Sequence, residues 1–153
     1  MLPSSAQELV EFIRTHIPLA HTMDLRYVHA EPGRLTLSAP LAPNINDKGC
    51  AFGGSLVSLM TLGGWAMVEL ALRARDWDCD VFVAESTVKY LAPVWEDLVC
   101  ESVLSPHSDW DTFFSTLNAR GRARIEVAST IAGESPDKPA ATLRARFVAK
   151  KRG

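Results

Sequence analysis

Apolar and polar residues alternate along several short segments of the chain, and one much longer segment is apolar almost throughout. On either side of the turn signal at Pro32-Gly33, residues 23–30 and 33–40 predict two strands joined in a hairpin. Residues 53–75 predict a helix about 30 Å long that is buried on most sides, because no broad polar face interrupts it. Four later segments return to the strand pattern: 81–93, 97–104, 122–133 and 140–150.

Two shorter helices complete the pattern. Residues 4–8 hold a serine N-cap followed by Gln and Glu, and the helix that they begin is expected to end before Pro18. Residues 108–121 open with Ser108 and Asp111 in capping-box spacing and close on a glycine, which predicts another short helix. In the strand 81–93 we expect one face to carry Phe82, Ala84, Val88 and Tyr90.

The order of these elements favours one architecture. A helix and two strands precede the long apolar helix, and three or four strands with short connections follow it, which favours an antiparallel sheet. A single buried helix with strands on both sides in sequence is covered best when one curved sheet wraps around it. The sequence therefore predicts an α+β fold of the hotdog type, with residues 1–153 forming one domain.

Composition removes several classes of function. Apolar residues make up 47% of the chain, charged residues 22%, and the formal net charge is −2, so nothing indicates a nucleic acid partner. The three cysteines are widely spaced and the four histidines form no cluster, which predicts a reduced, cytoplasmic protein without a metal site. The apolar run 56–72 contains Ser58, Thr61 and Glu69, so a buried helix is preferred to a membrane span.

Three motifs carry a resemblance to a known family: APLAPNIN at 39–46, FGGS at 52–55 and YLAPV at 90–94. Over roughly residues 17–148 the chain resembles the hotdog-fold thioesterase-like family of the YiiD C-terminal type. The resemblance implies at least a homodimer whose sheets join edge to edge, with a substrate pocket at the interface. It implies an acyl thioester of coenzyme A or acyl carrier protein as substrate, and no cofactor beyond the phosphopantetheine that this substrate carries. For some members it implies decarboxylation of malonyl-acyl carrier protein, which primes fatty acid synthesis, with a loop asparagine as the key residue.

The start of the long helix offers hydrogen-bond donors for a thioester oxygen. Gly53 and Gly54 have no side chains, so a carbonyl group can approach their backbone N–H groups, and the helix dipole adds positive character there. Such amides can form an oxyanion site, although a tight turn from loop to helix would need the same glycines. The substrate-binding residues that we expect around this point are Gly53, Ser55, Ser58, Thr61, Tyr90 and Arg122.

The same helix lacks the carboxylate of the common hotdog hydrolases. By resemblance, Phe52 stands where their histidine is expected and Thr61 where their Asp or Glu is expected, and threonine alone is no general base near neutral pH. Asp47 precedes Gly54 at the spacing found in a second branch of these enzymes, so it could serve as the base. A turn residue paired with Lys48 is the alternative, and the Asn-Asp-Lys-Gly sequence favours it.

Asn46 fits decarboxylation better than any neighbouring residue. Loss of CO₂ from a malonyl thioester needs no base at the first step, but it needs the thioester oxygen stabilised as an enolate. An asparagine amide can donate to that oxygen at any ordinary pH, and deletion of one such donor from an oxyanion hole costs about 3–4 kcal/mol. Asn44 is the less favoured of the two loop asparagines, and either one could instead only cap the loop.

Two other features leave alternatives open. Cys50 has no histidine near it in sequence, so a small buried residue is preferred to a nucleophile. The basic run 120–124, which includes Arg122, fits either the phosphates of coenzyme A, the acidic face of a carrier protein, or a solvated strand. Three functions remain: decarboxylation with Asn46 and the glycine amides, hydrolysis with Asp47 as base, and non-catalytic binding of an acyl thioester.

Overall fold

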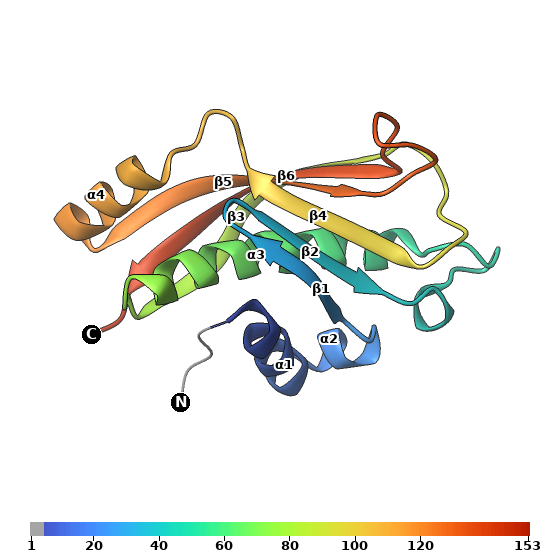
Figure 1. Ribbon diagram of the computed structural model, residues 1–153, viewed down its shortest axis with the longest axis horizontal. Coiled ribbons are helices and arrows are strands. Elements are labelled where there is room, and N and C mark those ends of the chain that lie inside the picture. The colour runs from blue at the N-terminus through green and yellow to red at the C-terminus, as the bar shows by residue number, and fades with distance from the viewer. Residues whose placement is uncertain (1–4) are drawn as a thin grey trace.

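A six-stranded sheet wraps around the long helix α3 (Gly53–Ala74) in the structure, a computed structural model that describes residues 5–153 (Figure 1). Neighbouring strands are antiparallel throughout, and their spatial order is β1-β2-β4-β5-β6-β3. The strands are β1 (Arg26–Glu31), β2 (Arg34–Ala39), β3 (Cys79–Tyr90), β4 (Leu98–Leu104), β5 (Arg122–Ile131) and β6 (Ala141–Lys151). The remaining elements are α1 (Ala6–His16), α2 (Pro18–Thr22), the 3₁₀ turn η1 (Ala42–Asn44) and α4 (Trp110–Arg120). The predicted hotdog architecture is confirmed.

The N-terminal helix begins and ends near the predicted places. The Ser5 hydroxyl accepts a hydrogen bond from the Glu8 N–H at 3.2 Å, which satisfies one of the free amides of α1. Pro18 ends α1 as expected, but it also opens the short helix α2, which the pattern did not predict. Proline suits the first helical position, since its missing N–H would have no partner there.

The helix α4 starts one residue later than its capping pattern suggested. Asp109 is the N-cap and accepts from the amides of Asp111 and Thr112 at 3.3 and 3.1 Å. The prediction of Ser108 as the cap is therefore wrong. The Ser108 hydroxyl instead accepts from the Glu126 N–H at 3.0 Å, which ties the start of α4 to β5.

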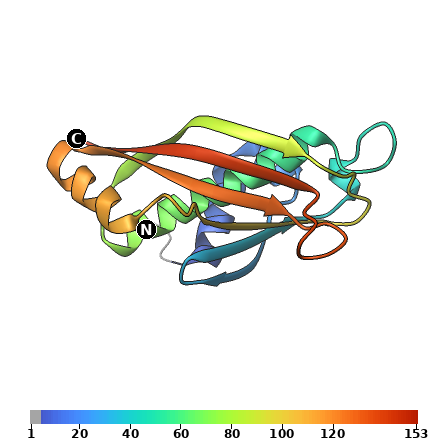
Figure 2. The same cartoon turned by 90° about the horizontal axis from the view of Figure 1, so that it is seen from above.

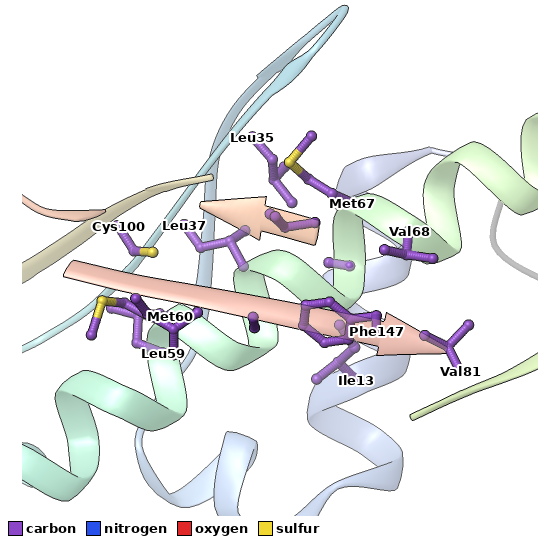
Figure 3. Packing of buried hydrophobic residues seen from close by; sticks show 14 of the residues in the cluster. Ile13, Leu35, Leu37, Leu59, Met60, Met67, Val68, Val81, Cys100 and Phe147 are labelled. Atoms are coloured by element: carbon purple, nitrogen blue, oxygen red, sulfur yellow. The ribbon is translucent and has the colours of Figure 1, made fainter. Parts of the chain in front are cut away.

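A second glycine pair, in the middle of α3, lets the helix lie close to the sheet. A Cβ atom on Gly63 would stand 2.5 Å from Ser102 Oγ, and one on Gly64 would stand 2.9 Å from Phe147 Cε2. Neither distance leaves room for a carbon atom, so the sheet packs directly on the helix backbone at this point. Figure 3 shows labelled core residues of α1, α3 and several strands around this region: Ile13, Leu37, Leu59, Met60, Cys100 and Phe147.

Two buried serines join the sheet to the helix beside this glycine pair. The register of β4 and β5 sets Ser102 opposite Ser129, and their hydroxyl oxygens are 2.6 Å apart. Ser129 also donates to the Met60 carbonyl oxygen of α3 at 3.1 Å. Both serines are fully buried, and each hydroxyl finds a partner in the other, so the core holds this polar link without an unpaired group.

The edge strand β3 carries a bulge that changes which side chains face the helix. Val83 pairs with Phe147, and Glu85 pairs with the next residue of β6, Arg146. Ala84 is therefore an extra residue that has no pairing partner on β6. Such an insertion shifts the alternation by one position. The prediction that Phe82 shares a face with Val88 and Tyr90 is therefore wrong. Phe82 lies on the outer face, away from α3, whereas Val88 and Tyr90 lie on the inner face.

The helix α3 is the one helix among residues 5–153 that is long and apolar enough to cross a membrane by those two criteria. Within the fold, however, 56% of its apolar window is buried. The side toward the sheet is fully enclosed, while a narrower stripe that includes Ser58 and Thr61 stays half-buried. This burial agrees with the predicted role of a central core helix.

We expect Gly63→Ala to destabilise the fold by about 1–3 kcal/mol, because the new methyl group must displace Ser102. The gain in helix propensity is smaller, at most about 1 kcal/mol. Urea unfolding followed by circular dichroism measures the change. The matched control is Gly63→Ala combined with Ser102→Ala, which removes the obstructing oxygen. A double variant as unstable as Gly63→Ala alone would contradict this account of the close approach.

Candidate functional site

The loop before α3 folds back on itself as a small hairpin. Ile45 and Ala51 form an isolated antiparallel bridge, and the Asn46 N–H donates to the Cys50 carbonyl oxygen at 2.8 Å. The Gly49 N–H closes the turn on the Asn46 carbonyl at 3.2 Å, with Gly49 at a φ of 90° that favours glycine. The turn thus sets Asn46 opposite Cys50, just ahead of the point where the helix begins.

Two longer-range hydrogen bonds hold this hairpin in place. The Phe52 N–H donates to the Asn44 carbonyl oxygen at 2.7 Å, and the Ala51 N–H donates to the Val94 carbonyl oxygen at 2.8 Å. The YLAPV motif, far along the chain, therefore meets the APLAPNIN and FGGS motifs at one end of α3.

The two loop asparagines have different surroundings. Asn44 is buried, and its amide nitrogen donates to the carbonyl oxygens of Met23 and Pro40 at 3.0 and 2.8 Å. Both amide hydrogens are used in this way, so Asn44 fastens the loop to the segments before it. Asn46 is half-buried, and its amide nitrogen has a single partner within residues 5–153, the weakly accepting Cys50 Sγ at 3.2 Å.

One hydrogen bond fixes which way the Asn46 amide points. The Lys48 backbone N–H donates to Asn46 Oδ1 at 2.8 Å. Since a backbone N–H can only donate, the oxygen must face the turn and the NH₂ group must face the other way. One of its two hydrogens meets Cys50, and the other has no acceptor among residues 5–153. Asn46 thus keeps an oriented donor available.

Asp47 lies at the tip of the turn. Its side chain is 82% exposed, and Lys48 Nζ is 3.0 Å from its Oδ1. This is the position of a solvated turn residue, which was the favoured alternative. The geometry gives no sign of the enclosed, partnered carboxylate that a general base usually is.

The first turn of α3 leaves two amides without partners. The amides of Ser55 and Leu56 donate to the Phe52 carbonyl oxygen at 2.9 and 3.1 Å. The N–H groups of Gly53 and Gly54 reach no acceptor among the described residues 5–153. Free helix amides of this kind are the donors that an oxyanion site requires.

Two aromatic rings flank these amides. A Cβ atom on Gly53 would be 3.4 Å from Tyr90 Cε1, and one on Gly54 would overlap the Phe52 ring. Both rings are more than half exposed, at 55% for Phe52 and 57% for Tyr90. Each glycine therefore has a local packing reason to be glycine, and the rings form apolar walls beside the free donors.

The half-buried stripe of α3 runs along the edge strand. Trp65, which shares the stripe with Gly54, Ser58 and Thr61, donates its indole N–H to the Val81 carbonyl oxygen of β3 at 3.0 Å. Ser55 is half-buried in the first turn. The hydroxyls of Ser58 and Thr61 have no hydrogen-bond partner among residues 5–153, so they do not bond back to the helix. They are free polar groups along the side of α3 that faces β3.

This stripe carries no carboxylate. The one acidic residue of α3 is Glu69, which is buried near the C-terminal end of the helix. Its Oε2 is 2.8 Å from Arg73 Nε, so the carboxylate is already paired. The absence of a helix carboxylate beside Gly54, expected from the sequence, holds in the structure.

Among the substrate-binding residues predicted from the sequence, Arg122 lies far from the rest within one chain. It pairs with Lys150 at the end of the sheet where β3 begins, whereas Tyr90 and Ala141 pair at the opposite end. About nine strand residues lie between these ends, which corresponds to roughly 30 Å. Arg122 therefore takes no part in the site formed by the loop and α3 of the same chain.

The thiols offer no nucleophile. Cys50 is buried and accepts from Asn46, as the preferred interpretation required. Burial raises the pKa of the Cys100 thiol to about 12, so this residue stays protonated at neutral pH. Among the described residues, no group of His, Cys, Asp and Glu could hold a metal ion.

The fold and this site define a class: a hotdog domain with an amide-donor cradle at the start of its central helix. The chain belongs to the family described as "Putative thioesterase (yiiD_Cterm)", whose model matches residues 6–151. The resemblance seen in the motifs is thereby confirmed.

Solved structures from three organisms show the same fold. A Chlorobaculum tepidum protein of unknown function is 30% identical, with 96% of this chain and 94% of that one covered, at a TM-score of 0.90. A Shewanella oneidensis protein described as a thioesterase in the same words as the family is 29% identical, with 93% and 94% covered, at a TM-score of 0.80. A Haemophilus influenzae thioesterase, 10% identical with 98% and 93% covered at a TM-score of 0.70, is alike in fold alone.

We expect Asn44→Ala to lower the free energy of unfolding by about 1–3 kcal/mol, because the carbonyl oxygens of Met23 and Pro40 lose the donor that this buried side chain gives them. Chemical denaturation of the variant and the parent measures the difference. Asn46→Ala is the matched control, since Asn46 is less buried and holds one weak acceptor; its loss should be smaller than that of Asn44→Ala. Equal losses in the two variants would refute the division of roles between the two asparagines.

Proposed function

We propose that this thioesterase-family protein decarboxylates malonyl-acyl carrier protein to acetyl-acyl carrier protein. The observation that carries the proposal is the oriented, free donor of Asn46 in the loop that leads into two free helix amides, where the first turns of α3 have no carboxylate and the neighbouring Asp47 is exposed to solvent. Such a site can stabilise negative charge on an oxygen, but it offers little to activate water.

The reaction needs few protein groups. The bond between the malonyl carboxylate carbon and its neighbouring carbon breaks, CO₂ leaves, and the electron pair moves onto the thioester carbonyl as an enolate. The Asn46 amide and the N–H groups of Gly53 and Gly54 donate to the enolate oxygen. A solvent proton then adds to the carbon, which yields the acetyl thioester. Phe52 and Tyr90 provide apolar walls, and a carboxylate that loses its hydration there leaves more readily as neutral CO₂.

Hydrolysis is the second candidate, because the family description names thioesterases. It needs a base that activates water. The exposed Asp47 is the nearest carboxylate in sequence, and its ion pair with Lys48 would have to open for this role. A binding module without turnover is the third candidate, which has no observation in its favour beyond the absence of a base.

The acting unit in this proposal is a homodimer. The β3 edge is twelve residues long and exposed over most of its length, which is a hazard for aggregation unless another strand covers it. Pairing of β3 with its copy would join the two sheets edge to edge and would close the half-buried stripe of α3 into a pocket.

Mass spectrometry of malonyl-acyl carrier protein incubated with the protein separates the three functions. Acetyl-acyl carrier protein as product means decarboxylation, and free holo-carrier means hydrolysis. An unchanged substrate under conditions where binding is detected means that the protein only binds. Malonyl-coenzyme A and acetyl-acyl carrier protein as parallel substrates show the preference for carrier and for the malonyl group.

We expect Asn46→Ala to lower kcat for decarboxylation by about 10²-fold or more, the scale of losing one oxyanion donor. Asn46→Asp should lose at least as much, because its carboxylate would face both the enolate and the malonyl carboxylate. The effect should lie in kcat rather than KM, since the hydrogen bond strengthens as charge develops.

Asp47→Asn and Asn44→Ala are the controls for this series. Asp47→Asn should leave decarboxylation within a few-fold of the parent, and Asn44→Ala should cost stability more than turnover. The mechanism is wrong if Asn46→Ala folds and decarboxylates nearly as well as the parent. A hundredfold loss of thioester hydrolysis in Asp47→Asn, with the fold intact, would instead support hydrolysis with this residue as base.

We expect a mass of at least twice 16.8 kDa in solution, because β3 buries its exposed edge against a second copy. Light scattering coupled to size exclusion at micromolar concentration measures this. Val83→Lys together with Val88→Lys places charge on the inner face of the edge strand and should shift the mass toward the monomer. A parent protein that runs at 16.8 kDa would exclude the dimer.

A further inference from the structure

The outer face of the sheet, away from α3, concentrates positive charge on two strands. Figure 2 views the molecule from above and shows β3, β6 and β5 side by side. Exposed cations project from β5 and β6 on this face, although the whole chain has a net charge of −2. We call them, together with two apolar residues at their centre, the basic patch: Arg122, Arg124, Arg144, Arg146, Lys150, Phe82 and Val148.

An apolar centre lies between these cations. Phe82 pairs with Val148 across β3 and β6, and Val148 pairs with Arg124 across β6 and β5, so the three side chains line up on one face. Phe82 is 59% exposed, although it is a large apolar residue. The bulge at Ala84 is what keeps Phe82 on this outer face. An aromatic residue beside a row of arginines and a lysine has the composition of a protein-binding hot spot.

The acidic residues on the same face are already engaged. Asp80 Oδ1 lies 2.7 Å from Arg152 Nε, and Glu85 Oε1 lies 2.9 Å from Arg146 Nη2, so both carboxylates are in ion pairs. Glu126 accepts from the Ser105 hydroxyl at 2.5 Å. Four cations of the basic patch, in contrast, have no carboxylate within 4.0 Å among residues 5–153: Arg122, Arg124, Arg144 and Lys150. Their charge is available to a partner.

We propose that the basic patch docks the acidic, helical face of the carrier protein that brings the thioester. This inference rests on the proposed function, and it adds where on the chain the carrier binds. From Arg144 to Lys150 the cations extend along about 20 Å of strand. A helix of about 13 residues covers that length, and acidic side chains on successive turns would meet the row while an apolar one meets Phe82.

The nucleotide end of coenzyme A fits this face less well. A phosphate cluster needs donors that converge on one point, and these cations lie in a row on an open sheet. The hollow on this face, about 110 Å³, is lined by Arg144 and Arg146 but also by Glu85 and Glu126, whose carboxylates repel phosphate.

In the edge-to-edge dimer, the basic patch of one protomer lies near the pairing seam with the other protomer. Two copies of β3 related by a twofold axis pair antiparallel, so the Phe82 end of one strand lies beside the Tyr90 end of the other. The Phe82 end of the patch of one protomer then lies on the outer face at the end of the joined sheets that holds the catalytic loop of the other protomer.

Binding of a fluorescently labelled holo-acyl carrier protein to the full-length protein tests the inference directly. Arg124→Glu combined with Lys150→Glu should raise the dissociation constant tenfold or more at low salt, and Phe82→Ser should weaken binding several-fold. Added salt should weaken parent binding. The matched control is Lys138→Glu, one charge reversal in the loop between β5 and β6, which should bind within twofold of the parent. Circular dichroism checks that each variant folds. If the Glu double variant does not fold, Arg124→Gln combined with Lys150→Gln replaces it in the binding measurement.

Kinetics with three malonyl thioesters separate this inference from the proposed function. The double variant should raise KM for the carrier-bound substrate tenfold or more and should leave turnover of malonyl-N-acetylcysteamine unchanged. If the parent binds the carrier but does not turn over any of the thioesters, the proposed function is refuted and the docking role of the basic patch still holds. Parent-like carrier binding by the double variant would overturn the inference. An equal rise in KM for malonyl-coenzyme A would also overturn it, since the patch would then serve the nucleotide.

Discussion

The close approach of α3 to the sheet is the constraint on which the rest of the structure depends. Gly63 and Gly64 let Ser102 and Phe147 sit against the helix backbone, and Ser129 fastens the same turn through the Met60 carbonyl. A helix held this tightly in its middle has little freedom at its ends. Its N-terminal turn therefore arrives at a fixed place, beside the end of β3 and the loop that precedes it.

The site then depends on how the loop divides two identical side chains. Asn44 and Asn46 have the same chemistry, but one is buried with both amide hydrogens spent on backbone carbonyls, and the other is turned outward by the Lys48 amide. The first provides a fixed loop and the second a directed donor. Preorganised donors of this kind stabilise developing charge because they need not reorient during the reaction. The same loop leaves Asp47 in solvent, where it pairs with Lys48, and this contrast with Asn46 is what favours the proposed decarboxylation over hydrolysis.

The edge strand β3 connects the inner and outer faces of the molecule. Its inner side borders the stripe of α3 that carries Ser58 and Thr61, and its outer side carries Phe82 among the cations of β5 and β6. A single extra residue, Ala84, assigns these side chains to their faces. Because one bulge sets both arrangements, the proposed pocket and the proposed docking surface depend on the same local irregularity.

The local pattern of the sequence was enough to predict the fold class and most of the elements, although not the short helix α2. Alternation predicted the strands, a long apolar run predicted α3, and the loop motifs drew attention to Gly53, Gly54 and Asn46, since each of these signals is local. Only the tertiary structure decided which residues share a face or a hydrogen bond. The bulge at Ala84 depends on pairing with β6, the burial of Asn44 depends on Met23, and the distance of Arg122 from the loop depends on the sheet order. Such contacts join residues that are far apart in the chain, so a local pattern of hydrophobicity cannot predict them.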